Sequence, residues 1–167
     1  ASVSGKWINR ISVRNIEHDG TKMKGTAYRV PKNPVAPGEK VKNEDMKIIE
    51  SMPVKSLITY PKSGAIISNK KTLTIRGHAW AGELEVSKVE YSIDFGATWA
   101  ICKTEKPANR LAWQRFSANI DFPKSGYYEV WARATDSNNI SQPMLLPGWN
   151  PKGYLNNACH RIAIKVK

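Results

Sequence analysis

The sequence predicts an all-β protein, an immunoglobulin-like antiparallel β-sandwich preceded by an extended N-terminal arm. From about Pro53 to the end, short apolar segments alternate with turn formers, which is typical of a sandwich of short strands. No window carries the 3.6-residue apolar stripe of a helix. The region before Pro53 instead contains a long polar stretch, which indicates an arm or linker rather than a second core.

The chain begins with a strand-like segment at residues 5–13. Ile11 and Val13 alternate with the polar Ser12, which is the two-residue period of a half-buried strand. We therefore expect this segment to form a strand.

A polar stretch follows at residues 17–45. It contains Pro31, Pro34 and Pro37 and has no sustained apolar period, so it buries little surface by itself. We expect it to lie on another surface, in this chain or beyond it. The last part, residues 45–51, fits a short helix and a short strand equally.

Four strands of the sandwich are predicted first, at residues 57–60, 73–77, 89–93 and 98–102. The first stops at Pro61, which cannot donate a hydrogen bond to a sheet. The third alternates apolar and polar side chains and runs into Asp94-Phe95-Gly96, which is a turn sequence.

Three further strands are predicted at residues 111–120, 128–134 and 162–166. The first of them carries Trp113. In the other two, apolar residues recur at every second position, so one face of each should meet the core. The residues expected on these core faces are Tyr128, Val130, Ala132 and Ala134, and then Ile162, Ile164 and Val166.

The composition limits the classes of function. With 167 residues, of which 41% are apolar, the chain can bury a core, and no apolar run is long enough to cross a membrane. A net charge of +12 implies attraction to an anionic partner. The basic residues form no block of the kind that marks a nucleic-acid arm. We therefore expect neither nucleic acid nor membrane as a partner, and the chain as given shows no targeting segment.

No catalytic motif is present. The sequence lacks the GxSxG elbow, the HExxH zinc motif and the GxxxxGK[ST] phosphate loop. His18, His78 and His160 lie far apart, so each is interpreted as structural. Cys102 and Cys159 form no CxxC-type metal pair. The residues alone indicate a binding or assembly module.

Two segments have a functional interpretation beside a structural one. Residues 149–161 are rich in turn formers and side-chain amides, which usually bond local backbone. Arg161 falls opposite Ile162, where it is either a solvent-facing arginine or a residue that binds an oxyanion. Near the start, Lys6 is either a surface lysine or a phosphate contact, with Gly5 allowing close backbone approach.

Several segments occur in the same order in one known family. They are PVKSLIT at 53–59, GHAWAG at 77–82, VEYSID at 89–94, GATW at 96–99, ARATD at 132–136, QP at 142–143 and the run at 149–161. On these segments, residues 52–166 resemble the C-terminal dimerisation domain of the sulfite oxidase family of molybdenum enzymes. The start, GKWINRI at 5–11, resembles the last segment of that family's catalytic domain.

The resemblance implies a division of the chain into two parts. Residues 1–52 would be the end of the catalytic molybdopterin domain with an extended linker arm. Residues 53–167 would be the immunoglobulin-like dimerisation domain. The chain would then be the C-terminal part of such an enzyme, or one chain of a split or processed one.

The chemistry implied by the resemblance belongs to the parent enzyme. A molybdenum–molybdopterin cofactor there would transfer an oxygen atom to sulfite or a related sulfur compound, with electrons passing to a cytochrome c. The family's molybdenum ligand is a cysteine well upstream of the Lys-Trp pair, and no cysteine precedes Trp7 here. We therefore expect no catalytic residue, no metal ligand and no bound cofactor in this chain alone, which would be part of an enzyme without being one itself.

The resemblance also implies site residues and partners. Arg161 matches an arginine that reaches from the sandwich toward the anionic substrate, and Gly5, Lys6 and Trp7 match positions that contact the cofactor. The expected partners are a second copy, joined through the sandwich, and the catalytic domain. Bacterial members are commonly exported, which predicts a periplasmic location.

Five tryptophans exceed what one small core holds, so we expect most in the core and one or two at an interface. They are Trp80, Trp99, Trp113, Trp131 and Trp149. The alternative to a dimerisation domain is a free-standing immunoglobulin-like module that binds an anionic ligand. A third hypothesis, a nucleic-acid-binding protein, is suggested only by the positive net charge of the chain.

Overall fold

The computed structural model describes residues 6–16, 20, 25–68 and 72–167 and divides into two compact units. The first unit comprises the chain up to Glu50 together with Pro147–Tyr154, and the second comprises Ser51–Leu146 and Leu155–Lys167. Each unit is described by itself. Among the described residues, no helix has the length and apolar character needed to cross a bilayer.

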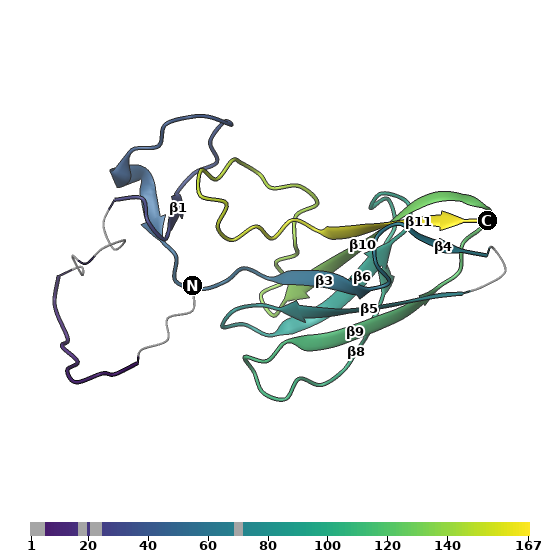
Figure 1. Ribbon diagram of the computed structural model, residues 1–167, viewed down its shortest axis with the longest axis horizontal. Coiled ribbons are helices and arrows are strands. Elements are labelled where there is room, and N and C mark those ends of the chain that lie inside the picture. Colours follow the sequence, from purple (N-terminus) through teal and green to yellow (C-terminus); the bar gives the residue numbers. More distant parts are fainter. Residues whose placement is uncertain (1–5, 17–19, 21–24, 69–71) are drawn as a thin grey trace. The chain divides into compact units, whose positions relative to one another are not determined.

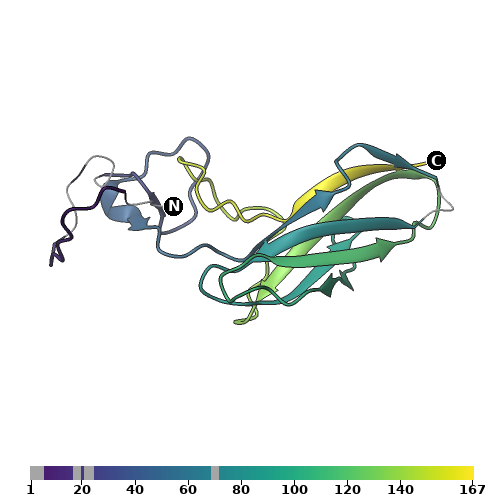
Figure 2. The ribbon, with the colours of Figure 1, turned by 60° about the horizontal axis from the view of Figure 1, so that its bottom comes forward.

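The second unit is a two-layered β-sandwich (Figures 1 and 2). Its strands are β3 (Lys55–Tyr60), β4 (Ala65–Ile67), β5 (Leu73–Trp80), β6 (Val86–Ser92), β7 (Ala100–Ile101), β8 (Lys103–Thr104), β9 (Gln114–Ile120), β10 (Gly126–Asp136) and β11 (His160–Val166). One sheet has the order β4-β11-β10-β6-β7 and the other β3-β5-β9-β8. All pairs are antiparallel except β4 with β11. The predicted all-β antiparallel sandwich is confirmed.

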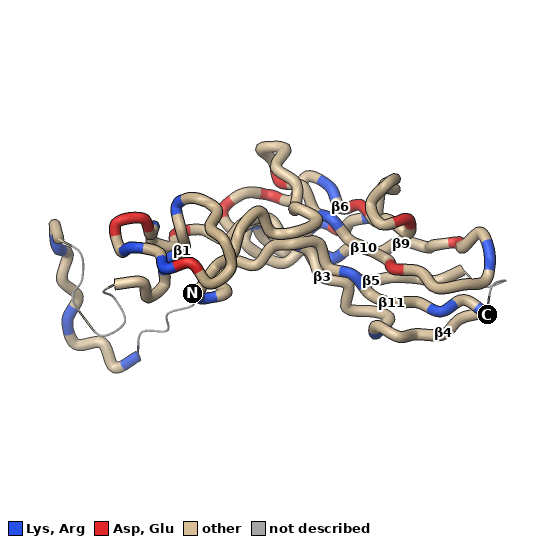
Figure 3. The backbone as a smooth tube through the Cα atoms, turned by 90° about the horizontal axis from the view of Figure 1, so that it is seen from above, with Lys and Arg blue, Asp and Glu red and all other residues tan. Residues whose placement is uncertain are grey.

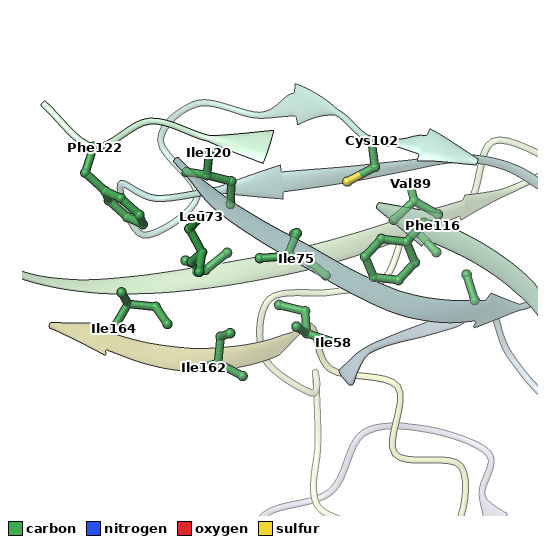
Figure 4. Close-up of a cluster of buried hydrophobic side chains, with 14 of the residues drawn as sticks. Ile58, Leu73, Ile75, Val89, Cys102, Phe116, Ile120, Phe122, Ile162 and Ile164 are labelled. Carbon is green, nitrogen blue, oxygen red and sulfur yellow. The ribbon is translucent and has the colours of Figure 1, made fainter. Parts of the chain in front are cut away.

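The core between the sheets is mainly aliphatic (Figure 4). Ile75, Val89, Ile120, Val130 and Ile164 are almost completely buried. The predicted core faces are also confirmed, because alternate residues of β10 and β11 point inward.

A glycine in β5 allows its two neighbouring strands in the four-stranded sheet, β3 and β9, to pack closely against it. A Cβ at Gly77 would collide with the carbonyl oxygen of Leu57 and with the ring of Phe116. Phe116 therefore packs across the backbone of Gly77, a contact that no other residue at this position permits.

The predicted turn after β6 is a hydrogen-bonded hairpin. Asp94 accepts hydrogen bonds from Ser92 Oγ at 2.6 Å, from Thr98 N at 2.9 Å and from Thr98 Oγ1 at 2.6 Å. Ser92 Oγ in turn accepts from Gly96 N at 2.9 Å. These bonds satisfy the polar groups of the turn and fix the exit toward β7.

Three strand predictions need correction in detail. Of the strand expected at residues 98–102, only Ala100–Ile101 forms a strand, β7, and the chain then switches at the buried Cys102 to β8 in the other sheet. The strand expected at residues 111–120 begins only at Gln114. The short edge strand Ala65–Ile67 was not predicted, since three residues carry no measurable period.

The strand predicted at residues 5–13 is wrong. Residues 6–14 adopt no regular structure, and the side chains of Ile11 and Val13 are 82% and 97% exposed. Two alternating apolar residues do not make a strand where no partner strand pairs with them.

The first unit has more structure than an arm. β1 (Arg29–Pro31) pairs antiparallel with β2 (Met46–Ile48), and the 3-10 turn η1 (Asn43–Asp45) precedes β2. The uncertainty over residues 45–51 is thus resolved as a short strand. The N–H of Trp149 donates to the carbonyl of Val35 at 2.9 Å, so Pro147–Tyr154 belongs to this unit.

The basic residues are dispersed, as the sequence indicated. Figure 3 shows Lys and Arg at many places along both units, with Asp and Glu between them.

Candidate functional site

Arg161 lies on the outer face of the five-stranded sheet. It is the second residue of β11 and pairs with Trp131 of β10. Because side chains alternate along a strand, it points away from the core that holds Ile162 and Ile164, as predicted. Its side chain is 56% exposed and therefore accessible to a ligand.

Three residues of β10 surround Arg161. The guanidinium carbon lies 5.2 Å from the centroid of the Trp131 ring, and Nη1 lies 3.6 Å from Oε2 of Glu129. Trp131 donates Nε1–H to this same oxygen at 3.0 Å, and the Tyr127 hydroxyl donates to Oε1 at 3.2 Å. Glu129 is thus held by both oxygens, and with the indole it orients Arg161.

A second arginine on this face is paired with a buried carboxylate. Nε and Nη2 of Arg133 donate to Oε2 of Glu90 at 3.2 and 3.0 Å, and the guanidinium carbon lies 4.0 Å from the Trp99 ring centroid. Lys88 donates to the other oxygen of Glu90 at 3.1 Å. Glu90 is buried, so Arg133 serves to neutralise a buried carboxylate.

The contrast between the two arginines shows which one is available to an anion. Arg133 donates two hydrogen bonds to Glu90. Among the described residues, Arg161 has one ion pair, to Glu129, and its 3.6 Å separation is longer than a hydrogen bond. An oxyanion reaching Arg161 would meet unused N–H donors in a planar fork, with Glu129 as the competing charge.

A buried amide fixes the segment that carries Arg161. Oε1 of Gln142 accepts from Ser56 Oγ at 2.6 Å and from Ala134 N at 2.8 Å, while Nε2 donates to the carbonyl of Asn157 at 3.0 Å. Gln142 therefore links β3, β10 and the segment before β11. The sequence singled out Gln142 only as part of a family motif, because a lone glutamine in a loop carries no sign of burial.

The neighbours of Arg161 in the chain bond to backbone groups, which for Asn156 are local, as expected, and for Asn157 and His160 lie in or next to β3. Asn156 Oδ1 accepts from Ala158 N at 3.2 Å, and Asn157 Nδ2 donates to the carbonyl of Val54 at 3.4 Å. Nδ1 of His160 accepts from a backbone N–H of β3. Burial lowers the pKa of His160, so the ring stays neutral and accepts this bond.

Both cysteines are buried and free. Burial raises the pKa of Cys102 to about 12 and that of Cys159 to about 11. The thiols therefore stay protonated at neutral pH, whereas a metal ligand is a thiolate. In the part of the chain that the structure describes, no group of three or more His, Cys, Asp or Glu residues is placed to hold a metal ion.

The other predicted site residues belong to the first unit. Gly5 lies outside the described residues. Lys6 and Trp7 are exposed, and the Trp7 indole is 99% exposed. Arg161 belongs to the second unit and is a separate candidate position.

The expectation that most of the five tryptophans lie in the core is wrong. Trp131 is buried, but on the outer face of its sheet, while Trp113 and Trp149 are exposed. Trp80 and Trp99 are partly buried. Mainly aliphatic residues, together with Phe116, Phe122 and Cys102, form the buried core between the sheets, and no tryptophan belongs to it.

Comparison with known families identifies most of the chain. The family model described as "Mo-co oxidoreductase dimerisation domain" matches residues 46–167. The mitochondrial sulfite oxidases of Mus musculus and Homo sapiens are each 30% identical to the chain over 96% of its length. The NADH nitrate reductase 1 of Oryza sativa subsp. japonica is 28% identical over 96% of the chain.

The chain is much shorter than these relatives. It spans 30% of the two sulfite oxidases and 19% of the nitrate reductase. Among solved structures, the sulfane dehydrogenase SoxCD from Paracoccus pantotrophus superposes with a TM-score of 0.61 at 24% identity, covering 87% of this chain and 36% of that one. This likeness shows a shared fold.

Proposed function

The chain belongs to the Mo-co oxidoreductase dimerisation domain family, and from this premise we propose that it joins two copies of a larger, sulfite-oxidase-like molybdenum enzyme. The resemblance to the sulfite oxidase family is confirmed by the relatives, which match nearly the whole chain. In this proposal residues 1–52 are the end of the catalytic domain with its linker, and residues 53–167 are the dimerisation domain.

The finer part of the proposal is that Arg161 faces the anionic substrate. The observation that carries it is the exposed guanidinium, whose only ion pair among the described residues is the 3.6 Å contact with Glu129. A doubly charged oxyanion such as sulfite fits a planar fork of donors held by an aromatic ring and a carboxylate. Arg161 would bind and orient the substrate, while the reacting atoms lie in the catalytic domain.

The described residues do not by themselves enclose a molybdopterin cofactor. Lys6 and Trp7 are exposed, and the two thiols are protonated and buried. The cationic Lys6 suits a phosphate of the pterin at the edge of a site formed largely elsewhere. When bound, the cofactor would supply oxygen-atom transfer, and this chain would contribute binding contacts.

We further propose that the electrons pass to a cytochrome c and that the enzyme works in the periplasm. The first follows the family resemblance, and the second follows the habit of bacterial members. Both concern the whole enzyme, of which this chain is a part.

Intact mass spectrometry of the chain in its native source tests the proposal. A species well above 18.7 kDa, with molybdenum and sulfite-dependent reduction of cytochrome c, is expected. A species of 18.7 kDa that binds anions without a molybdenum partner would instead favour the free-standing binding module.

A further inference from the structure

A surface hollow lies beside the turn between β5 and β6. Its volume is about 310 Å³, and it is closed on the other side by the loop that precedes β9. Leu84, Val86, Pro107 and Leu111 give it an apolar lining together with Trp80. Leu111 is 62% exposed, so a large apolar side chain stands at the rim.

An exposed aromatic pair adjoins this hollow. Trp113 stacks on Trp80 with ring centroids 4.9 Å apart and planes inclined by 20°. Trp113 is 58% exposed, although a tryptophan gains much from burial. Leu111 and Trp113 are thus two apolar projections beside a hollow whose lining is partly apolar and partly polar. Such a surface can be self-complementary.

The walls of the hollow are held together. Nη1 of Arg110, in the loop before β9, donates to the carbonyl of Glu83, in the β5–β6 turn, at 2.6 Å. The hollow therefore exists before any partner binds, which limits the ordering cost of association.

The charges around the hollow are balanced. Exposed Glu83 and Glu85 lie on the turn side, and exposed Lys106 and Arg110 lie on the loop side. Two copies of a chain with net charge +12 repel each other, so they can meet only where charge is locally neutral or complementary. A nucleic acid or a strongly acidic protein would find no excess of positive charge here.

The outer face of the five-stranded sheet differs in this respect. It presents Lys88, Arg133, Arg161 and Lys165 against Glu90 and Glu129. Its positive excess would oppose contact with a second copy.

We propose that the hollow between the β5–β6 turn and the loop before β9 is the contact face between two copies, with Leu111 and Trp113 of each copy packed against the hollow of the other. A two-fold axis brings the acidic side of one hollow to the basic side of its partner. This inference rests on the proposed dimerisation function and adds its location and chemistry. Fully buried apolar anchors inside a charged rim are the usual centre of such a contact.

The first test replaces the rim leucine. In sedimentation velocity of the 167-residue chain, Leu111→Asp should weaken dimerisation by about tenfold or more, because each dimer would bury two carboxylates in an apolar contact. Leu145→Asp is the matched control, since Leu145 is 73% exposed and lies outside the hollow. Circular dichroism and thermal melting establish that both variants are folded, and Trp113→Ala provides a second, uncharged variant with the same expected direction.

The second test uses the balanced rim. Glu85→Lys and Lys106→Glu should each weaken self-association, because each puts like charges against each other in the two-fold pair. An equimolar mixture of the two variants should recover a dimer, since opposite charges then face one another. A mixture no tighter than either variant alone would overturn the proposed face.

The outcomes separate this inference from the function on which it rests. Suppose that the unmutated 167-residue chain is a dimer and that Leu111→Asp and Trp113→Ala are as dimeric as Leu145→Asp. That result would overturn the proposed face and leave the dimerisation function standing. An unmutated 167-residue chain that stays monomeric at every concentration would overturn the dimerisation function and the inference together. Loss of the dimer in Leu111→Asp and Trp113→Ala, with Leu145→Asp still dimeric, would support the dimerisation function and the proposed face.

Discussion

The guanidinium of Arg161 lies over the indole of Trp131, 5.2 Å from the ring centroid, and the two residues face each other across the β10–β11 pair. Trp131 also donates to Glu129, which lies 3.6 Å from the same guanidinium. Strand β10 therefore carries both the aromatic ring and the carboxylate that contact Arg161 on the neighbouring strand β11. This places an accessible cation at a defined position on the outer face of the sheet.

Arg161→Ala in the whole enzyme should raise the KM for sulfite about ten- to a hundredfold, because a charge-assisted pair with the substrate is lost. Arg161→Lys should recover part of the effect, since the charge is kept and the planar fork is lost. Arg76→Ala is the matched control. The guanidinium carbon of Arg76 likewise lies over an aromatic ring, 4.5 Å from the centroid of Tyr60, but on the four-stranded sheet. Steady-state kinetics measures all three, and an unchanged KM for Arg161→Ala would identify Arg161 as an ordinary surface residue.

Glu129→Gln should have the opposite effect on substrate binding. The amide keeps the shape of the side chain but removes the charge that competes with the anion for Arg161. We expect the KM for sulfite to fall about two- to fivefold, the range of a partly exposed ion pair. Glu105→Gln is the control. Glu105 also forms an ion pair, with 4.0 Å between its Oε2 and Nη1 of Arg115, but it does not contact Arg161. A higher KM for Glu129→Gln would mean that Glu129 chiefly orients Arg161 rather than competing for it.

The turn after β6 should give the sandwich a measurable sensitivity to acid. Hydrogen bonds from Ser92 and Thr98 lower the pKa of Asp94 from 3.8 to about 2. Since the native pKa is below the unfolded one, this stabilisation is present above about pH 4 and is lost as the pH falls toward 2. Asp94→Asn should therefore be less stable than the parent near neutral pH, and the difference should shrink between about pH 4 and 2. Urea unfolding at a series of pH values measures this, and a difference independent of pH would contradict the assignment.

Gly77→Ala should destabilise the sandwich by about 2 kcal/mol or more, because the added Cβ meets the Leu57 carbonyl and the Phe116 ring. Phe116→Leu removes part of the obstruction, so the double variant should lose less stability than the sum of the two single changes. Denaturant unfolding of the four proteins measures this coupling. Strict additivity would show that the ring of Phe116 does not set the requirement for glycine.

The sandwich was predictable from the sequence because its strands bury one face. In β10 and β11 the alternation of Val130, Ala132, Ile162 and Ile164 with polar residues is the physical signature of such a strand. The sheet switch at Cys102 was not predictable, since it depends on which strands lie alongside. The alternation of Ile11 and Val13 was misleading for the same reason, because a strand needs a partner.

The candidate site was predictable only in part. The two-residue period placed Arg161 on the outer face, and the family motif gave it a role to test. Its contacts with Trp131 and Glu129 depend on the register between β10 and β11, which short-range sequence patterns do not specify. The buried role of Gln142 likewise depends on contacts with distant strands.

The most direct test of the account is sedimentation equilibrium of the 167-residue chain over a wide range of concentration. The account predicts a reversible equilibrium between monomer and dimer, with a limiting mass of twice 18.7 kDa at high concentration. A constant mass of 18.7 kDa at every concentration would contradict a dimerisation domain.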